Sequence, residues 1–281
     1  MKYNNKTLLG LFLGMLFMTE LAMATGPRVT QSMLVETENE MYAVDAPPFV
    51  SLDVAENGLS ASIVNAALKA VETKATLTIF PVTKMVTYYL NEEQALAVYD
   101  EYISFSEDEK KSLIYVPVFY AKESYIYSKL RYKEGLNGQG SLSDLSGLKY
   151  GTHRSEKQAR SIYEEAGIEL VFARHYALFN KLVAGEVDFI KMPDLAISWM
   201  LEHDNSVQKE HFSTMDISTQ LVPKFIVFNK NNPDGEKMAQ KLKQGLSIIL
   251  ENGQYAELLK KYLHEDDVNE RVKSLTQSLQ P

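Results

Sequence analysis

Apolar positions along the chain follow two periods, and segments of one period alternate with segments of the other. Apolar residues two apart or in short continuous runs are typical of strands, whereas apolar residues three and four apart are typical of helices. We predict strands at 41–44, 75–80, 96–99, 103–105, 113–130, 148–152, 169–172, 187–191 and 223–229, and helices at 63–70, 83–90, 155–166, 176–184, 194–201, 235–250 and 254–263. This alternation indicates an α/β fold and not a sandwich of strands.

Capping residues and helix breakers support several of these limits. The paired prolines of Asp45-Ala-Pro-Pro-Phe49 interrupt a regular ladder and fix an extended turn. Ser155-Glu-Lys-Gln158 is a capping box that opens a helix, and Gly185 is placed as a glycine cap that closes one. The loop at 132–140 holds three glycines without a phosphate-loop spacing, and the polar tail beyond His264 is expected to fray.

The segment Met1–Ala24 has the three parts of a secretory signal peptide. Lys2 and Lys6 give a positive start, an uncharged apolar run follows from Leu8 to Met18, and Ala22-Met-Ala24 is an A-x-A cleavage site. The run is shorter than the roughly 20 apolar residues that span a bilayer, which favours a cleaved signal over a membrane anchor. We expect cleavage after Ala24 and a secreted, periplasmic mature chain.

The composition excludes several kinds of site. The chain has no cysteine, which rules out disulfides, thiolate metal sites and a cysteine nucleophile. Its net charge is −8, so no basic face for nucleic acid is expected. Neither a zinc-protease motif nor a nucleophile elbow occurs. We expect no catalytic residue, no metal and no cofactor, but a general acid–base pair leaves no local signature, so an enzyme stays open as an alternative.

Four short motifs follow one another at intervals along the chain. They are Asp45-Ala-Pro-Pro-Phe49 with Gly58, Ser141-Leu-Ser-Asp-Leu-Ser-Gly-Leu-Lys-Tyr-Gly151, Leu182-Val-Ala-Gly-Glu-Val-Asp188, and 242–263 with its Glu-Asn-Gly-Gln-Tyr255 and Lys-Lys-Tyr262. In this order, and behind a signal peptide, they resemble the bacterial extracellular solute-binding proteins of family 3, whose best-known members bind polar amino acids. The resemblance covers most of the mature chain.

The resemblance implies a two-lobed, periplasmic-binding-protein-like fold of type II, with two hinge crossings and a discontinuous first lobe. The chain would leave the first lobe near Phe119–Lys122 and return near Gln220–Pro223. The first lobe would hold 25–120 plus 221–281, and the second lobe 121–220. Ligand would lie between the lobes, at strand ends and helix N-termini, and hinge closure would trap it.

The resemblance also implies a function, the capture of a small polar solute, anionic or amino-acid-like, for an ABC-type transporter. The implied partners are the solute and a membrane permease, and the protein is expected to be a monomer. Three alternatives stay open. They are a sensory or accessory module that reports to a membrane partner, an enzyme of the dehydratase kind on the same fold, and an envelope interaction protein that binds no small molecule.

One departure from the resemblance concerns the ligand carboxylate. Family members that bind amino acids place an arginine at the position that falls here on Asp108 or Glu109. A carboxylate cannot replace the guanidinium fork, which argues against ordinary amino-acid binding. We interpret Glu107–Lys111 as the solvated start of a helix.

Thr152, Arg154 and Ser155 are candidate contacts for an anionic group. They lie where a strand of the second lobe ends and a helix begins, and free backbone N–H groups make such a place attractive to anions. The resemblance places the ligand carboxylate at the same position. The alternative is that Ser155 only caps the helix and Arg154 points to water.

Four further residues complete the candidate site. Asp194 follows Asp188 at about the distance of the family's second acidic residue, which binds an ammonium group; the alternative is a helix cap. Phe49 and Tyr115 are candidate aromatic walls, or core residues. Lys84 stands where a subset of the family carries a basic residue that faces the cleft; the alternative is a solvated lysine on a helix.

Overall fold

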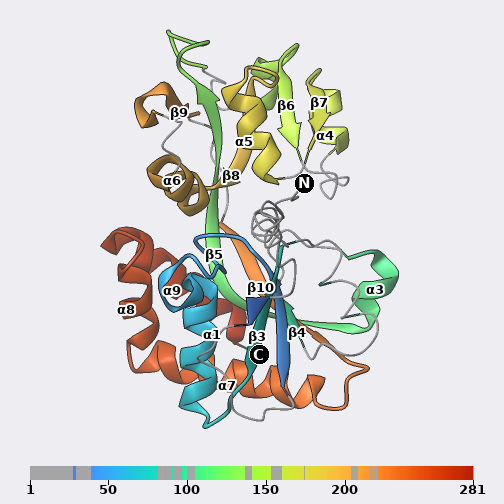
Figure 1. Ribbon diagram of the computed structural model, residues 1–281, viewed down its shortest axis with the longest axis vertical. Helices are drawn as coiled ribbons and strands as arrows, with labels where there is room; N and C mark the ends of the chain where they lie inside the picture. The colour runs from blue at the N-terminus through green and yellow to red at the C-terminus, as the bar shows by residue number, and fades with distance from the viewer. Residues whose placement is uncertain are drawn as a thin grey trace, which may run out of the picture.

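The computed structural model has two lobes that meet at one long strand (Figure 1). The structure describes residues 28–29, 39–81, 86, 90, 97–99, 105–136, 141–152, 160–173, 175–203, 208–215, 217 and 221–280. Three candidate contacts, Lys84, Arg154 and Ser155, lie outside the described residues.

The described strands form one continuous sheet that runs through both lobes. They are β1 (Arg28–Val29), β2 (Glu40–Val44), β3 (Thr76–Phe80), β4 (Ala97–Tyr99), β5 (Leu113–Ser128), β6 (Lys149–Thr152), β7 (Glu169–Phe172), β8 (Phe189–Pro193), β9 (Phe212–Thr214) and β10 (Leu221–Asn229). Their spatial order is β1-β3-β2-β4-β10-β5-β8-β6-β7, and β9 pairs with β5 off this path. The first lobe holds β1 to β4, the first part of β5, and everything from β10 onward; the second lobe holds the rest of β5 and the elements up to β9.

Strand β5 changes its partner where it passes between the lobes. Lys122 pairs with Leu221 of β10, and the next residue, Glu123, pairs with Pro193 of β8. Because β10 begins at Leu221, the chain returns to the first lobe beside the point where it leaves. The expected fold, an α/β structure with two hinge crossings and a discontinuous first lobe, is confirmed.

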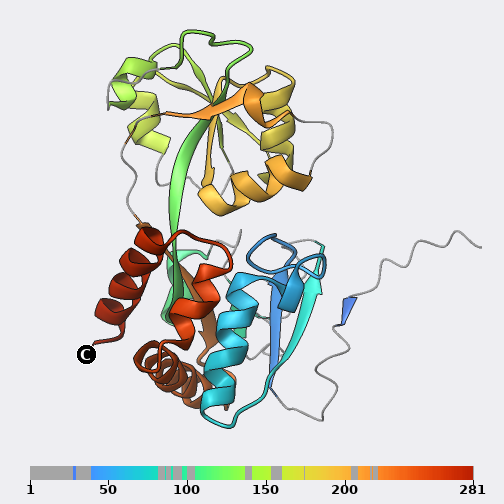
Figure 2. The same cartoon turned by 90° about the vertical axis from the view of Figure 1, so that its left-hand side faces the viewer.

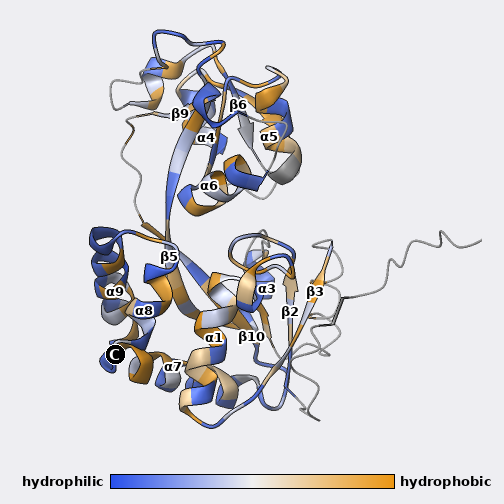
Figure 3. Cartoon of the chain, turned by 60° about the vertical axis from the view of Figure 1, so that its left-hand side comes forward, coloured by the Kyte–Doolittle hydropathy of each residue, from blue (hydrophilic) through white to orange (hydrophobic). Residues whose placement is uncertain are grey.

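Helices of the first lobe cover one face of its sheet (Figure 3). They are α1 (Leu59–Ala70), α7 (Gly235–Glu251), α8 (Gln254–Lys260) and α9 (Glu265–Leu279), with the short η2 (Ala55–Asn57) and α3 (Glu107–Lys111) elsewhere. The apolar stripe of α7 puts Leu242, Leu246 and Ile249 in the core with no exposed surface. This packing fixes the sheet from which both crossings start.

The second lobe is built in the same way from shorter elements. Its helices are η3 (Leu142–Leu145), α4 (Arg160–Glu165), α5 (His175–Val183), α6 (Asp194–His203) and η5 (Lys209–His211). Tyr150 stacks on Phe189 with ring centroids 5.2 Å apart, and the hydroxyls of Tyr125 and Tyr163 lie 2.9 Å from each other. These aromatic contacts hold β5, β6, β8 and α4 together.

The polar tail beyond His264 is ordered, so the expectation that it frays is wrong. It forms α9, in which Val268 and Leu275 are buried against the first lobe. Val268, Val272, Leu275 and Leu279 recur at helical spacing and supply the buried stripe. The other expected elements are present near their predicted limits, apart from 83–90 and 103–105, which lie mostly outside the described residues, and the start of 155–166 with its predicted capping box, which lies outside them as well.

Candidate ligand-binding site

Among the candidate residues that the structure describes, Asp194 lies beside the crossing. It is the first residue of α6 and directly follows Pro193, the partner of Glu123. Its atom Oδ1 is buried and has no hydrogen-bond partner among the described residues. A buried acceptor without a donor is uncommon in folded proteins and calls for an explanation.

The groups around Asp194 shift the pKa of its carboxyl group in opposite directions. Burial is the largest influence and raises the pKa of the carboxyl group. A hydrogen bond with Ser124 and the charges of Lys122 and Arg271 lower that pKa, and the charge of Asp267 raises it. The net pKa lies above the ordinary value, so the charge of Asp194 is only partly compensated.

Thr152 ends strand β6 in the second lobe, as the sequence predicts. It is 3% exposed, and its carbonyl oxygen accepts a hydrogen bond from the backbone N–H of Ala173 at 3.1 Å. Strand β7 runs parallel to β6, so both strands end at the same edge of the sheet. The predicted contacts Arg154 and Ser155 follow directly in the chain, outside the described residues.

Phe49 lies in the core of the first lobe. It is 1% exposed, and its ring centroid is 6.0 Å from that of Phe119. Backbone N–H groups of Leu59 and Ser60 donate to the carbonyls of Pro48 and Phe49 at 2.9 Å. In this arrangement the ring supports the core, which is the alternative considered from the sequence.

Tyr115 also packs within the first lobe. It is half-buried on β5, and its ring meets Phe225 and Phe105 edge-on, with centroids 5.5 Å and 6.3 Å away. Seven residues of strand separate it from Lys122, roughly 23 Å at the usual rise of a strand. The structure therefore does not bring Tyr115 next to Asp194.

The segment that replaces the usual arginine position is a solvated helix, as predicted. Ser106 and Glu109 form a capping box at the start of α3, and the side chain of Asp108 is 92% exposed. Lys110 and Lys111 pair with Glu107 and Asp108 within the same helix. No guanidinium from α3 is therefore available to a ligand.

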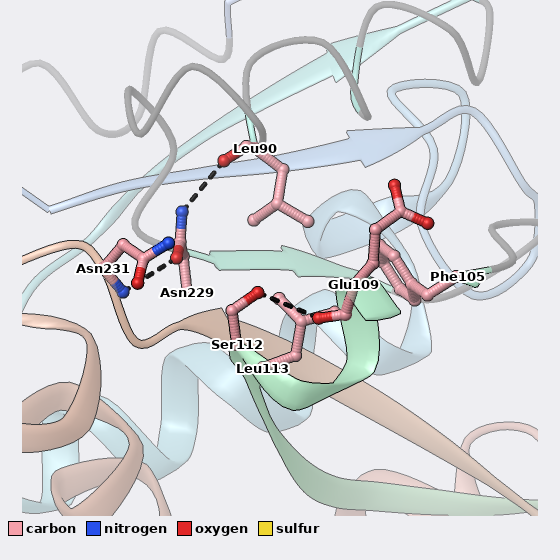
Figure 4. A pocket seen from close by; sticks show the side chains of 7 residues that line it. All are labelled: Leu90, Phe105, Glu109, Ser112, Leu113, Asn229 and Asn231. Carbon is pink, nitrogen blue, oxygen red and sulfur yellow. Dashed lines mark hydrogen bonds between the residues drawn. The ribbon is translucent and has the colours of Figure 1, made fainter. Parts of the chain in front are cut away.

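A pocket of about 270 Å³ lies in the first lobe (Figure 4). It is lined by Leu90, Phe105, Glu109, Ser112, Leu113, Asn229 and Asn231. Asn229 donates to the carbonyl of Leu90 and accepts from the N–H of Asn231, both at 2.9 Å, and the hydroxyl of Ser112 donates to the carbonyl of Glu109 at 2.9 Å. These polar groups of Asn229 and Ser112 already have partners within the protein, and Asp194 and Thr152 are not among the lining residues.

Reasoning from the sequence missed the polar and charged residues that influence Asp194. Lys122 and Ser124 come from β5, and Arg271 comes from α9 in the other lobe. A signal for Arg271 existed, because it stands within the apolar stripe of its helix, three residues after Val268 and four before Leu275.

The described residues offer neither a metal-binding cluster nor a membrane-spanning helix. No group of three or more histidine or acidic side chains in the described ranges could hold a metal ion. None of the described helices combines the length and the apolar character needed to cross a membrane.

No protein-family profile and no curated protein sequence matches the chain, whereas many solved structures do. The GluR0 ligand-binding core of Nostoc punctiforme, solved with L-glutamate, is 15% identical, with a TM-score of 0.61 over 80% of this chain and 99% of that one. A periplasmic binding protein of an arginine transport system from Legionella pneumophila is 17% identical, with the same TM-score and coverage. A histidine kinase sensor domain with similarity to periplasmic binding proteins is 16% identical, with a TM-score of 0.63 over 80% of this chain and 96% of that one.

These similarities concern the fold. The chain has the two-lobed fold of periplasmic binding proteins, as the motifs in its sequence led us to expect. At such low identities the ligands and partners of the similar proteins do not transfer by themselves.

Proposed function

We propose that this protein binds a small polar solute between its lobes and closes on it by rotation about the crossing strands. The observation that carries the proposal is the carboxylate of Asp194, which starts a helix beside the crossing and has a buried oxygen with no hydrogen-bond partner among the described residues. An ammonium group on the ligand would supply the missing donor in a charge-assisted hydrogen bond.

The anionic end of the ligand is proposed to lie at the end of β6. Thr152 is placed there, and Arg154 and Ser155 follow it in the chain. Lys84 is proposed as a further basic contact. Phe49 and Tyr115 pack within the first lobe, so their proposed role as walls requires a rearrangement of side chains inside that lobe. A ligand with an ammonium and an anionic group would use both ends of this site.

We propose delivery to an ABC-type transporter as the role of the bound solute. The protein would be a periplasmic monomer, secreted by a signal peptide cleaved after Ala24, with lobes at 25–120 plus 221–281 and at 121–220. The similarity to a binding protein of an arginine transport system supports this role. Catalysis is not part of the proposal, because the structures reported above as similar are named as binding or sensor proteins.

Sensing is the second candidate function. It is favoured by the similarity to a histidine kinase sensor domain, whose TM-score is as high as that of the binding protein from the arginine transport system. A sensor would close on its ligand in the same way and report closure to a membrane partner.

Binding is tested by a thermal-shift screen followed by calorimetry. The mature chain is screened against amino acids, amines, small carboxylates, sugars and short peptides; a ligand at 100 times its Kd raises stability by about 2.7 kcal/mol. For an ammonium ligand, Asp194→Asn is expected to weaken binding by tenfold or more. Asp144→Asn, the same change on an exposed turn of the second lobe, is expected to leave it unchanged.

Two results would contradict the proposal. A folded protein that shifts with no class of solute would favour an interaction protein without a small ligand. Equal affinities of the Asp194→Asn variant and the unmodified chain would remove Asp194 from the site. Transport and sensing are then separated by deleting the gene, because loss of ligand uptake indicates delivery, and intact uptake with a lost response indicates sensing.

A further inference from the structure

Two charged side chains from opposite lobes flank the crossing, and each has an unused hydrogen-bonding atom. Asp194 of the second lobe has its buried Oδ1 without a donor. Arg271 of the first lobe is 2% exposed, and its Nε is buried without an acceptor. Both statements hold among the residues that the structure describes.

The other contacts of Arg271 hold it in place but leave Nε unused. Its Nη1 donates to the carbonyl of Asp267 at 2.9 Å and to Oδ1 of the same residue at 3.2 Å. Its guanidinium lies over the ring of Phe119, 5.9 Å from the centroid. Glu270 is 3.9 Å from Nη1 and 58% exposed, so it compensates the charge weakly.

The two groups lie on either side of the same short piece of β5. Arg271 stands over Phe119, and Asp194 follows the partner of Glu123. Four residues separate Phe119 from Glu123, about 13 Å along a strand. Figures 2 and 3 show α9 beginning beside the point where β5 leaves the first lobe, and α6 lying along the facing edge of the second lobe. The charge of Arg271 lowers the pKa of Asp194, which places each group in the field of the other.

We propose that Asp194 and Arg271 form an ion pair across the crossing when the lobes rotate, and that this pair acts as a latch for one lobe angle. In the arrangement seen here the latch is open, because Oδ1 and Nε each lack a partner. A buried unpaired charge costs free energy that a paired one recovers in part. Arg271 already pairs with Asp267 through Nη1 at 3.2 Å, so the gain comes from the two remaining atoms, because the new pair gives Oδ1 of Asp194 a cationic donor and Nε of Arg271 an acceptor. The arrangement in which the pair forms is therefore stabilised relative to the one in which both atoms lack a partner.

The test measures the distance between the lobes in the ligand-free protein. Because the chain has no cysteine, Lys129→Cys in the second lobe and Lys243→Cys in the first give two unique sites for spin labels, both exposed. The spin-labelled protein that carries only these two cysteine substitutions is expected to show two distances between the labels, one for each lobe angle. Asp194→Asn and Arg271→Gln are each expected to reduce the latched population at least threefold, and the double variant no further.

Glu270→Gln is the matched control, since it removes an exposed carboxylate beside Arg271 and leaves the latch intact. Thermal unfolding confirms that each variant is folded, and if Arg271→Gln does not fold, Arg271→Lys takes its place in the cycle. An unchanged distance distribution in Asp194→Asn overturns the proposal, and so do effects of the two variants that add independently. The measurement uses no ligand, so its outcome is separate from that of the solute-binding proposal.

Discussion

The carboxylate of Asp188 ties together three parts of the second lobe. It is 3% exposed and accepts hydrogen bonds from the hydroxyl of Tyr132 and, at 2.7 Å, from the backbone N–H of Lys149. Its Oδ1 also lies 3.0 Å from Nη2 of Arg131. We expect Asp188→Ala to lower the free energy of unfolding by about 3 kcal/mol, because it removes a buried carboxylate and leaves partly buried donors without their acceptor. Urea denaturation measures this change.

Glu169→Ala is the control for Asp188→Ala. Glu169 pairs with the side chain of Lys149 at 3.8 Å and is 63% exposed, so its removal is expected to cost less than about 0.5 kcal/mol. Equal losses in the two variants would show that Asp188 contributes no more than a surface pair. The sequence marks Asp188 by its motif, but its partner Tyr132 is 56 residues away, in the loop predicted at 132–140. Pairings of this kind depend on the tertiary fold and leave no periodic signal.

Helices α1 and α7 approach each other closely at Gly245. A Cβ added there would lie 2.0 Å from the backbone oxygen of Ala67. Alanine favours a helix over glycine by about 1 kcal/mol, but overpacking costs about 1–3 kcal/mol and sometimes more. Because a backbone atom cannot rotate away, we expect Gly245→Ala to lower the free energy of unfolding by at least 1 kcal/mol, measured by urea denaturation.

Lys243→Ala, at an exposed position of the same helix, separates packing from helix propensity. It is expected to change the free energy of unfolding by less than about 0.5 kcal/mol. A Gly245→Ala variant that is more stable than the unmodified chain would mean that the two helices can move apart at no cost.

The spacing of apolar residues predicts individual helices and strands well in this chain. The exception is α9, whose apolar spacing was misread as a frayed polar tail. Its first turn holds Glu265, Asp266 and Asp267, and the density of charge hid a stripe that includes Val268 and Leu275. Acidic residues at a helix N-terminus are favourable, so the charged turn marks a beginning and not a frayed end. The strand β5 was predicted in full because its apolar run continues through both lobes.

The length of β5 predicts a strand that leaves the first lobe, and the resemblance carried by the four motifs implies the two-lobed arrangement, whereas no sequence pattern predicts the charges at the crossing. Sixteen residues of strand extend about 53 Å, more than one small lobe needs, so the sequence indicates a crossing. Asp194 and Arg271 lie on different lobes, and no local pattern relates them. Asp194 was a candidate from its motif, and Arg271 became one only when the fold placed α9 beside the crossing.

The charge of Asp194 should make stability depend on pH in a direction that the structure fixes. Burial raises the pKa of its carboxyl group above the ordinary value of 3.8, and the charge of Asp267 raises it further. Ser124, Lys122 and Arg271 lower it, but not enough to cancel the effect of burial. The folded state therefore favours the protonated form, and this contribution to stability is complete below pH 3.8 and is lost as the pH rises through the folded-state pKa.

Asp194→Asn lacks this titration. Its free energy of unfolding relative to that of the unmodified chain is therefore expected to rise from about pH 3 to pH 7, whatever the constant effect of the substitution. Urea denaturation across this range measures the difference. Asp144→Asn is the control, because it makes the same exchange of a carboxylate for an amide at an exposed position. A difference that stays flat or falls with pH would show that the ionised carboxylate is fully compensated in the folded protein. The latch would then lose its driving force, because a compensated Asp194 gains nothing from meeting Arg271.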